Sequence, residues 1–182
     1  MAQGATVYNF DIDLADEGRG VYESLAIRAA RHPSESAEFL LTRVLAYALE
    51  YTEGLAFSTG GLSDPDDPAL TVRDLTGALR VWIEVGHPEP ARLHKAAKAA
   101  PRVVVYAHRD STRWLDRVAA ERIHRAPELE IRVFDSALID ALATRLERRM
   151  SFALSVTDGE LFIALGEEQF TGALSSRRVA TA

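Results

Sequence analysis

The sequence predicts a mixed α/β (α+β) protein in which a central sheet is flanked by helices and extended by a β-hairpin at each end. Short apolar runs rich in β-branched residues, such as Arg102–Ala107, are typical of buried strands. Between them, apolar residues recur every three or four positions, as in amphipathic helices. Near both ends of the chain, apolar and polar residues alternate on either side of a turn. The 182 residues contain no linker or repeat, so we expect one domain over residues 1–182.

The first hairpin is expected over residues 5–30. From Ala5 to Leu14 the side chains alternate, which predicts a half-buried strand. The turn-forming run Asp16–Gly20 follows. Tyr22–Ala30 alternates in the same way and predicts the second strand. A short helix is the alternative there, because Leu, Ala and Arg all favour helices.

The first helix is expected from Ser34, which is suited to cap it, to about Tyr51. Its apolar stripe is formed by Leu41, Val44, Leu45, Ala48 and Leu49. Glu38 lies three and seven residues before two members of this stripe and is expected to point inward, whereas Glu35 lies nearer the flank. Both acids are candidate catalytic residues, and Glu38 is also a candidate metal ligand. The alternative is that both acids only stabilise the positive end of the helix.

An acidic loop follows the short strand expected at Leu55–Ser58. Turn-forming residues continue to Pro68, and Asp64, Asp66 and Asp67 lie among them. Carboxylates are the ligands that Mg²⁺ prefers, so Asp66 and Asp67 are candidate metal ligands. The alternative is that these aspartates form turns in a solvated loop.

A buried strand that carries one acid is expected over Leu79–Gly86. Glu84 lies inside its apolar run, and a buried carboxylate is unfavourable unless something pairs with it. A metal ion is one such partner and a cationic side chain is another. Glu84 is therefore a candidate catalytic residue and a candidate metal ligand.

The helix expected from Glu89 to Ala100, after a turn at Gly86–Pro88, carries a basic face. The basic residues recur at three- and four-residue spacing and are Arg92, Lys95, Lys98 and Arg102. One interpretation is that this face, spanning residues 91–102, contacts the phosphates of a nucleic acid, or that Lys95 points into a site near Glu84. The alternative is a solvated face.

The second half of the chain is expected to alternate strands and helices before the C-terminal hairpin. Arg102–Ala107 is apolar after its first residue and predicts a central strand buried on both faces. Later elements are expected at Thr112–His124 (helix), Leu129–Phe134 (strand), Ala137–Arg148 (helix), Phe152–Val156 and Leu161–Leu165 (hairpin), and Glu168–Leu174 (edge strand). Trp114 is expected in the core, Ser136 is expected to cap a helix whose last turn is basic, and residues 175–182 are expected to fray.

The composition excludes several classes of function. The net charge of −6 opposes sequence-independent binding to nucleic acid, except through a locally basic cleft. The absence of cysteine excludes disulfides and zinc sites built on thiolates. The sequence has no Gly-rich nucleotide loop, and its five histidines show no short metal-ligand spacing. It has no signal peptide or membrane-spanning run, so we expect a cytoplasmic protein without membrane contact.

Several short runs, spread over nearly the whole chain, carry a resemblance to a known family. They are Arg31–Glu35, Gly61–Ser63 with its acidic loop, Arg73–Asp74 before Thr76–Gly77, Trp82–Gly86 with Pro88, Lys95–Ala96, and the hairpin at Asp158–Gly159. Together they resemble the YaeQ family of bacterial proteins, whose function is unknown. The resemblance implies a restriction-endonuclease-like fold, a variant of the PD-(D/E)XK nucleases. A nuclease of that type would place one acid on the first core helix, a Pro-Asp pair and a second acid on strands, and a lysine.

This chain departs from that pattern in two places. Leu79-Arg80 stands where the family usually has Pro-Asp, and Gly86 stands two residues after Glu84 where the nuclease motif has lysine. Lys95 would then take the role of the lysine. Arg80 and Glu84 share one face of the strand by alternation. We therefore expect Arg80, rather than a metal ion, to neutralise Glu84.

The leading hypothesis is a degenerate or reshaped nuclease site on a restriction-endonuclease-like fold. The first alternative is an active Mg²⁺-dependent nuclease that uses Glu38, Asp66 or Asp67, Glu84 and Lys95, with the metal activating a water molecule. The second alternative is a non-catalytic module that presents its basic helix face to a nucleic acid or a protein. The sequence leaves the protein partner and the oligomeric state open.

Overall fold

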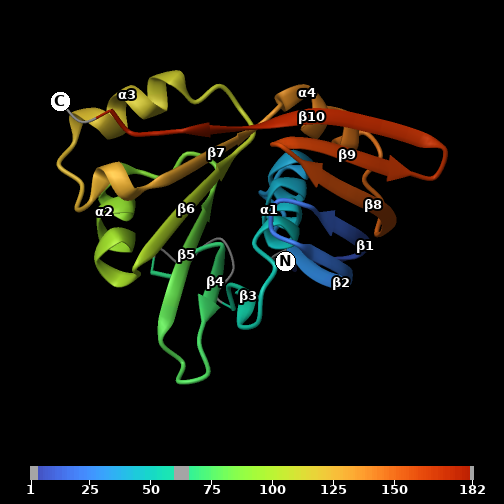
Figure 1. The fold of residues 1–182 in the computed structure, drawn as a ribbon, viewed down its shortest axis with the longest axis horizontal. Coiled ribbons are helices and arrows are strands. Elements are labelled where there is room, and N and C mark those ends of the chain that lie inside the picture. Colours follow the sequence, from blue (N-terminus) through green and yellow to red (C-terminus); the bar gives the residue numbers. More distant parts are fainter. Residues whose placement is uncertain (1–3, 60–65, 181–182) are drawn as a thin grey trace.

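The computed structural model describes residues 4–59 and 66–180. Within them, ten strands form one mixed sheet and four α-helices pack against it (Figure 1). The strands are β1 (Thr6–Asp16), β2 (Val21–Arg31), β3 (Leu55–Phe57), β4 (Leu70–Arg73), β5 (Leu79–Val85), β6 (Arg102–Ala107), β7 (Glu130–Phe134), β8 (Arg149–Thr157), β9 (Glu160–Leu165) and β10 (Glu168–Arg177). The helices are α1 (Ala37–Leu49), α2 (Pro90–Ala99), α3 (Thr112–Ala120) and α4 (Ser136–Ala143), with a short 3₁₀ turn at Ala126–Glu128.

The sheet has the strand order β2-β1-β8-β9-β10-β7-β6-β5-β4-β3. Strands β5, β6 and β7 are parallel, β1 is parallel to β8, and the other neighbours are antiparallel. The sheet curves into a nearly closed barrel whose two halves enclose α1 (Figure 1). The long strand β10 joins these halves, since it pairs first with β9 and then, through Leu174–Arg177, with β7. The mixed α+β class predicted from the sequence is therefore confirmed.

Helix α1 is the centre of the fold. Its buried residues include Leu41, Arg43 and Ala46, which lie on different sides of the helix, because sheet or α4 covers it all round. The helix begins after Ser36, whose hydroxyl accepts a hydrogen bond from the Phe39 backbone N–H at 3.1 Å. The prediction that Ser34 is the cap was wrong, because Ser34 instead bonds the ring of His32 at 2.6 Å in the preceding turn.

Helices α2 and α3 cover the other face of β5, β6 and β7 (Figure 1) and enclose a second apolar core. Trp114 of α3 and Val105 of β6 are buried there, whereas Val104 of β6 is buried on the α1 side. The predictions that β6 is buried on both faces and that Trp114 is a core residue are confirmed. Helix α4 packs against α1 and β10. This contact needs the glycine at Gly172, since a Cβ there would lie 2.8 Å from the Cβ of Leu138.

The N-terminal hairpin is confirmed. β1 and β2 pair in register from Thr6 with Arg31 to Asp16 with Val21, so the short helix considered for the second strand is wrong. The C-terminal hairpin of β8 and β9 is also confirmed, with Asp158 and Gly159 in its turn. Strand β4 was not predicted, because turn-forming residues precede it closely and it has only four residues.

Several predicted boundaries in the second half were wrong. Helix α3 ends at Ala120 rather than His124. Asp135, not Ser136, caps α4 by accepting from the Ala137 N–H at 3.0 Å. Helix α4 ends at Ala143, so the basic residues expected in its last turn bind elsewhere, as Arg145 does to Glu168 at 2.6 Å.

The C-terminal segment is part of the sheet. An edge strand was predicted at Glu168–Leu174, and its residues up to Ala173 pair with β9 alone. β10 continues beyond the predicted end to Arg177, and residues 174–177 pair with β7. The expected fraying of residues 175–182 was wrong for the residues described, because Ser175–Arg177 pair with β7 and Val179 is buried in the second core. Among the described residues, no helix is both long and apolar enough to cross a membrane.

Candidate functional site

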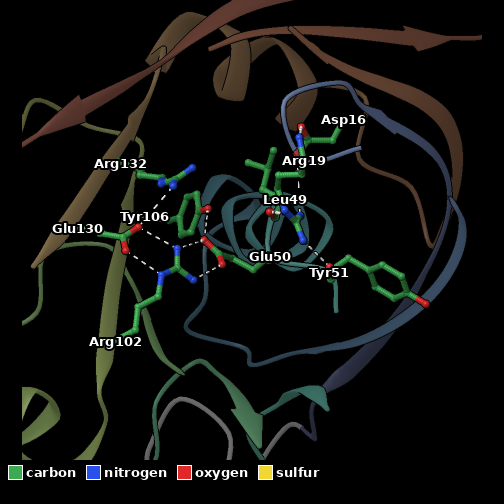
Figure 2. Close-up of polar contacts among 9 residues, drawn as sticks. All are labelled: Asp16, Arg19, Leu49, Glu50, Tyr51, Arg102, Tyr106, Glu130 and Arg132. Carbon is green, nitrogen blue, oxygen red and sulfur yellow. Dashed lines mark hydrogen bonds and ion pairs between the residues drawn. The ribbon is translucent and has the colours of Figure 1, made fainter. Parts of the chain in front are cut away.

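The C-terminal end of α1 holds a network of ion pairs (Figure 2). The buried carboxylate of Glu50 accepts hydrogen bonds from Tyr106 Oη at 2.7 Å and from Arg102 at 2.6 Å. Arg102 also bonds Glu130 at 2.7 Å, which raises the pKa of Arg102 and lowers the pKa of Glu130. Arg132 contacts Glu130 at 3.4 Å. Each charge in this network is matched by an opposite charge, as expected for a structural cluster.

Arg19 closes the same end of α1 (Figure 2). From the β1–β2 turn, its guanidinium donates to the backbone carbonyls of Leu49 and Tyr51, each at 2.5 Å. Asp16 fixes the turn by accepting from the Arg19 backbone N–H at 3.1 Å. A cation at the negative end of a helix satisfies carbonyls that lack a partner within the helix. Both clusters at this end are therefore explained by the stability of the fold.

Glu84 lies near the carboxyl end of β5, and its partner is Arg92. Only 4% of Glu84 is exposed. Its Oε1 accepts from Arg92 Nε and from Trp82 Nε1, both at 2.6 Å. Arg92 also donates to the backbone carbonyl of Asp67 at 2.8 Å. Burial raises the pKa of Glu84, while the hydrogen bond from Trp82 and the charge of Arg92 oppose that shift.

The expected contact between Arg80 and Glu84 was wrong. Arg80 is exposed and binds Asp74 at 2.6 Å in the β4–β5 turn. Alternation puts residues four apart on one face of a strand, but it also separates them by about 13 Å along the strand. The sequence therefore predicted correctly that Glu84 has a cationic partner, but the cation comes from the following helix.

The two acids near the start of α1 have different environments. Glu35, predicted on the helix flank, is 4% exposed and binds Arg43 at 2.7 Å. Glu38, predicted to point inward, is only partly buried. A hydrogen bond from its own backbone N–H is the main cause that lowers the pKa of Glu38, and Ser36, His108 and Arg109 add to it. The inward direction therefore belongs to Glu35, whose charge is already paired.

The acidic loop contacts α2. Lys95 binds Asp66 on the protein surface, so this predicted lysine contacts a predicted acid. Ser58 binds Asp67, and Asp67 shares with Glu84 the lining of a 350 Å³ cavity, called here the Glu84 cavity. Asp64 lies outside the described residues.

These carboxylates do not form a metal site within the part of the chain that the structure describes. No group of three or more His, Asp or Glu side chains is arranged there to hold a metal ion. The oxygen of Glu84 that faces α2 already binds the guanidinium of Arg92. A cation in this position competes directly with Mg²⁺ for the carboxylate. The residues present therefore do not fit Mg²⁺ without rearrangement.

A second cavity of 460 Å³, called here the histidine cavity, lies at the carboxyl ends of β5 and β6. Its lining consists of Ser34, Glu35, Ser36, Phe39, Gly86, His87, His108 and Arg109. It adjoins the Glu84 cavity, since Phe39 and His87 line both. His87 stacks on Trp114, with 5.0 Å between ring centroids, and its Nε2 lies 2.9 Å from Ser111 Oγ. Burial, and then the charge of Arg109, lower the pKa values of His87 and His108.

The comparisons with known proteins identify the family. The model of the YaeQ protein family matches residues 1–174, which is almost the whole chain. This chain belongs to the YaeQ family. Its curated relatives include the uncharacterised YaeQ proteins of Salmonella typhi, 30% identical, and Escherichia coli K12, 28% identical, each over 166 residues. These matches cover 90% of this chain and 91% of each relative.

Solved YaeQ structures have the same fold. The crystal structure of YaeQ from Xanthomonas axonopodis pv. citri matches with a TM-score of 0.86 and 32% identity, over 97% of this chain and 99% of that one. The structure of YaeQ from Pseudomonas syringae matches with a TM-score of 0.86 and 33% identity, over 94% and 95%. The predicted YaeQ membership is confirmed, and these relatives are bacterial.

In this YaeQ chain, the predicted basic face of residues 91–102 is divided. Arg92 and Lys95 form the ion pairs described above, and Arg102 belongs to the network at the C-terminal end of α1. Lys98 is exposed near the end of α2. Binding of nucleic acid through this face stays a prediction, as does the cytoplasmic location.

Sequence reasoning missed His87, His108 and Arg109 as site residues of this YaeQ protein. The five histidines were dismissed because no two have the spacing of metal ligands. The useful signal was their position, since each of these residues follows a predicted buried strand, and the structure shows that β5 and β6 are parallel. The carboxyl ends of parallel strands are where ligands bind in open α/β sheets.

Proposed function

We propose that this YaeQ protein has a restriction-endonuclease-like fold with a reshaped nuclease site. In this proposal it binds a nucleic acid or a protein and does not cleave phosphodiester bonds with a metal ion. The order of elements supports the proposal: α1 is followed by an antiparallel meander of β3, β4 and β5, and α2 then leads to the parallel strand β6. One acid lies on the first helix, one in the loop before β4 and one on β5. They are Glu38, Asp67 and Glu84. The helix acid and the β5 acid match the PD-(D/E)XK pattern, whereas the second strand acid of that pattern is replaced by an acid in the loop.

The observation that carries the proposal is the contact of Glu84 with both Arg92 and Trp82. In a metal-dependent nuclease this carboxylate would bind the cation. Here two donors already contact one of its oxygens at 2.6 Å, and one donor carries a full positive charge. The ion pair therefore takes the place of a metal ion and removes the group that would activate water.

An active Mg²⁺-dependent nuclease using Glu38, Asp66 or Asp67, Glu84 and Lys95 is the alternative enzyme. One observation favours it: Asp67 and Glu84, two of the candidate metal ligands, line the same cavity. For that enzyme to work, Arg92 must leave Glu84 when the metal binds, and Lys95 must leave Asp66 to face the substrate.

Metal titration separates these functions. Thermal melting is followed in millimolar Mg²⁺ or Mn²⁺, and circular DNA, linear DNA and RNA are assayed for cleavage. We expect no stabilisation of the native protein and no cleavage. Cleavage that is lost in Glu84→Ala would instead establish the nuclease.

A charge-reversal pair tests the site itself. Arg92→Asp places a second carboxylate beside Glu84, and we expect this variant to gain melting temperature with Mg²⁺. Arg80→Asp makes the same change of charge on β5, but it lies near Asp74 and outside the lining of the Glu84 cavity, so we expect no gain in melting temperature. Equal responses of the two variants would contradict the assignment of Arg92 as the group that replaces the metal.

A further inference from the structure

His108 is a buried polar side chain without a hydrogen bond. It is 6% exposed and lines the histidine cavity, yet neither Nδ1 nor Nε2 has a partner among the described residues. Nearly all buried polar groups in folded proteins are bonded, so an exception needs an explanation. In a cavity, the natural explanation is a ligand atom that completes the bond. The lowered pKa keeps this imidazole neutral, so it can offer one N–H and one acceptor nitrogen.

The charges around the cavity favour an anionic group at one end. Arg109 is exposed and lines the wall next to His108. The thirteen-residue helix α1 begins at the same wall, but the Ser36 hydroxyl and the Glu38 carboxylate already accept from its first backbone N–H groups, so Arg109 is the group that would bind an anion. Two acids oppose an anion, since Glu38 and Asp140 both interact with the ring of His108. Glu35 also lines the cavity, but Arg43 pairs with it.

One side of the cavity is formed by the aromatic ring of Phe39. The ring of Phe39 packs closely on Gly86, where an added Cβ would lie 3.1 Å from it. Glycine at this position therefore keeps the ring at the boundary between the two cavities. An aromatic ring beside one cation and one buried imidazole suits a ligand with an apolar body and a charged end.

We propose that the histidine cavity binds a small organic molecule that carries a terminal oxyanion, either a carboxylate or a phosphate. Arg109 holds the oxyanion, the ring of His108 turns toward the cavity to bond a polar atom of the ligand, and the apolar body of the ligand packs on Phe39. The inference goes beyond the function proposed above, because it concerns the neighbouring cavity and needs no nucleic acid or metal. The outcome of the cleavage assay therefore neither supports nor contradicts this inference.

The test uses three aromatic probes of similar size: phenyl phosphate, benzoate and the neutral benzyl alcohol. Binding is measured by calorimetry and by the NMR signals of the histidine ring nitrogens in the native protein. We expect at least one anion to bind saturably and to shift the ring signals of His108, with benzyl alcohol much weaker. The stronger of the two anions identifies phosphate or carboxylate as the natural group. No shift at His108 with either anion, or equal binding of benzyl alcohol, would overturn the proposal.

Three variants test how individual charged side chains affect binding of the anion. Arg109 is exposed, so Arg109→Ala is expected to fold and to weaken binding of the preferred anion about tenfold, the usual contribution of one charge-assisted contact. Glu38→Gln removes a repelling charge and is expected to strengthen binding. Lys98→Ala also removes one exposed cation, but on α2 away from the cavity lining, and leaves binding unchanged. Equal losses in the arginine and lysine variants would indicate only a general effect of protein charge and would refute the site.

Discussion

Arg92→Leu is expected to destabilise the protein by leaving Glu84 buried without its cation. Breaking a buried ion pair by removal of one partner typically lowers the free energy of unfolding by about 3–5 kcal/mol. Two features reduce that figure here. The side chain of Arg92 is 24% exposed, and the bond from Trp82 to Glu84 remains in the variant. We therefore expect a loss of about 2 kcal/mol near neutral pH.

The loss of stability in Arg92→Leu should depend on pH, and the protonation of Glu84 decides whether it grows or shrinks as the pH rises. Burial already raises the pKa of Glu84 in the native protein, and removal of Arg92 raises it further. A carboxyl whose pKa is higher in the folded state than in the unfolded state holds its proton better when folded. The variant is therefore closest to the native protein below the ordinary pKa of 4.5, and it loses stability as the pH rises through the folded pKa. Each unit by which the folded pKa of Glu84 in the variant exceeds that in the native protein adds about 1.4 kcal/mol to the loss.

Urea unfolding at about pH 5 and about pH 8 measures this difference. The two buried tryptophans, Trp82 and Trp114, provide the fluorescence signal. Lys95→Met is the matched control, because it also removes one cation from α2 but breaks an exposed pair worth about 0–1 kcal/mol. Adding Glu84→Gln to Arg92→Leu should recover much of the loss, since no buried charge remains. A loss that equals the control and does not change with pH would refute the assignment of Glu84 as a buried ion-pair partner.

Two further predictions test local features of the fold. Gly86 and Gly77 have similar positive φ values of 87° and 84°, but an added Cβ meets the ring of Phe39 only at Gly86. In urea unfolding, Gly86→Ala should therefore cost more than the roughly 1 kcal/mol of backbone strain expected for Gly77→Ala, and equal losses would show that the ring moves freely. The pKa of Asp74 is about 2, mainly because the Thr76 hydroxyl bonds its carboxylate, so its stabilisation is present above 3.8 and is lost as the pH falls to about 2. Carboxyl NMR should show this value and a higher one in Thr76→Ala, and titration near 3.8 in the native protein would contradict the bond.

Much of the fold was predicted from local patterns. Alternation in strands and recurrence every three or four residues in helices both report which face of an element is buried. Arg102–Ala107 was predicted to be buried on both faces, and its alternate residues do divide between the two cores. What local patterns do not report is which strands become neighbours. Glu168–Leu174 was predicted as an edge strand, and its residues up to Ala173 do pair with β9 alone, but β10 continues to Arg177 and β7 pairs with its last four residues. That pairing joins segments about forty residues apart, and no local signal encodes it.

The site was harder to predict for a related reason. The need for a cation near Glu84 follows from burial alone, but its identity depends on how α2 packs over β5. Alternation suggested Arg80, whereas the helix brings Arg92 to the carboxylate. The histidine cavity was missed because the histidines were judged only by their spacing as metal ligands. The importance of His108 arises from burial without a partner, which only the packed structure shows.

The two ends of α1 differ in how far their buried polar groups are satisfied by hydrogen bonds within the protein. At the C-terminal end, Glu50 has three hydrogen bonds from Arg102 and Tyr106, so the charges there are satisfied internally (Figure 2). A ligand at that end would have to displace strong contacts. At the N-terminal end, the buried imidazole of His108 has no hydrogen-bond partner within residues 4–59 and 66–180, and two adjoining cavities lie between β5 and the helix. Because a protein gains stability by satisfying its buried polar groups, an end left unsatisfied is where selection for binding is the better explanation. The same argument separates the two proposals: the Arg92–Glu84 pair has an internal partner and needs no ligand, whereas His108 does.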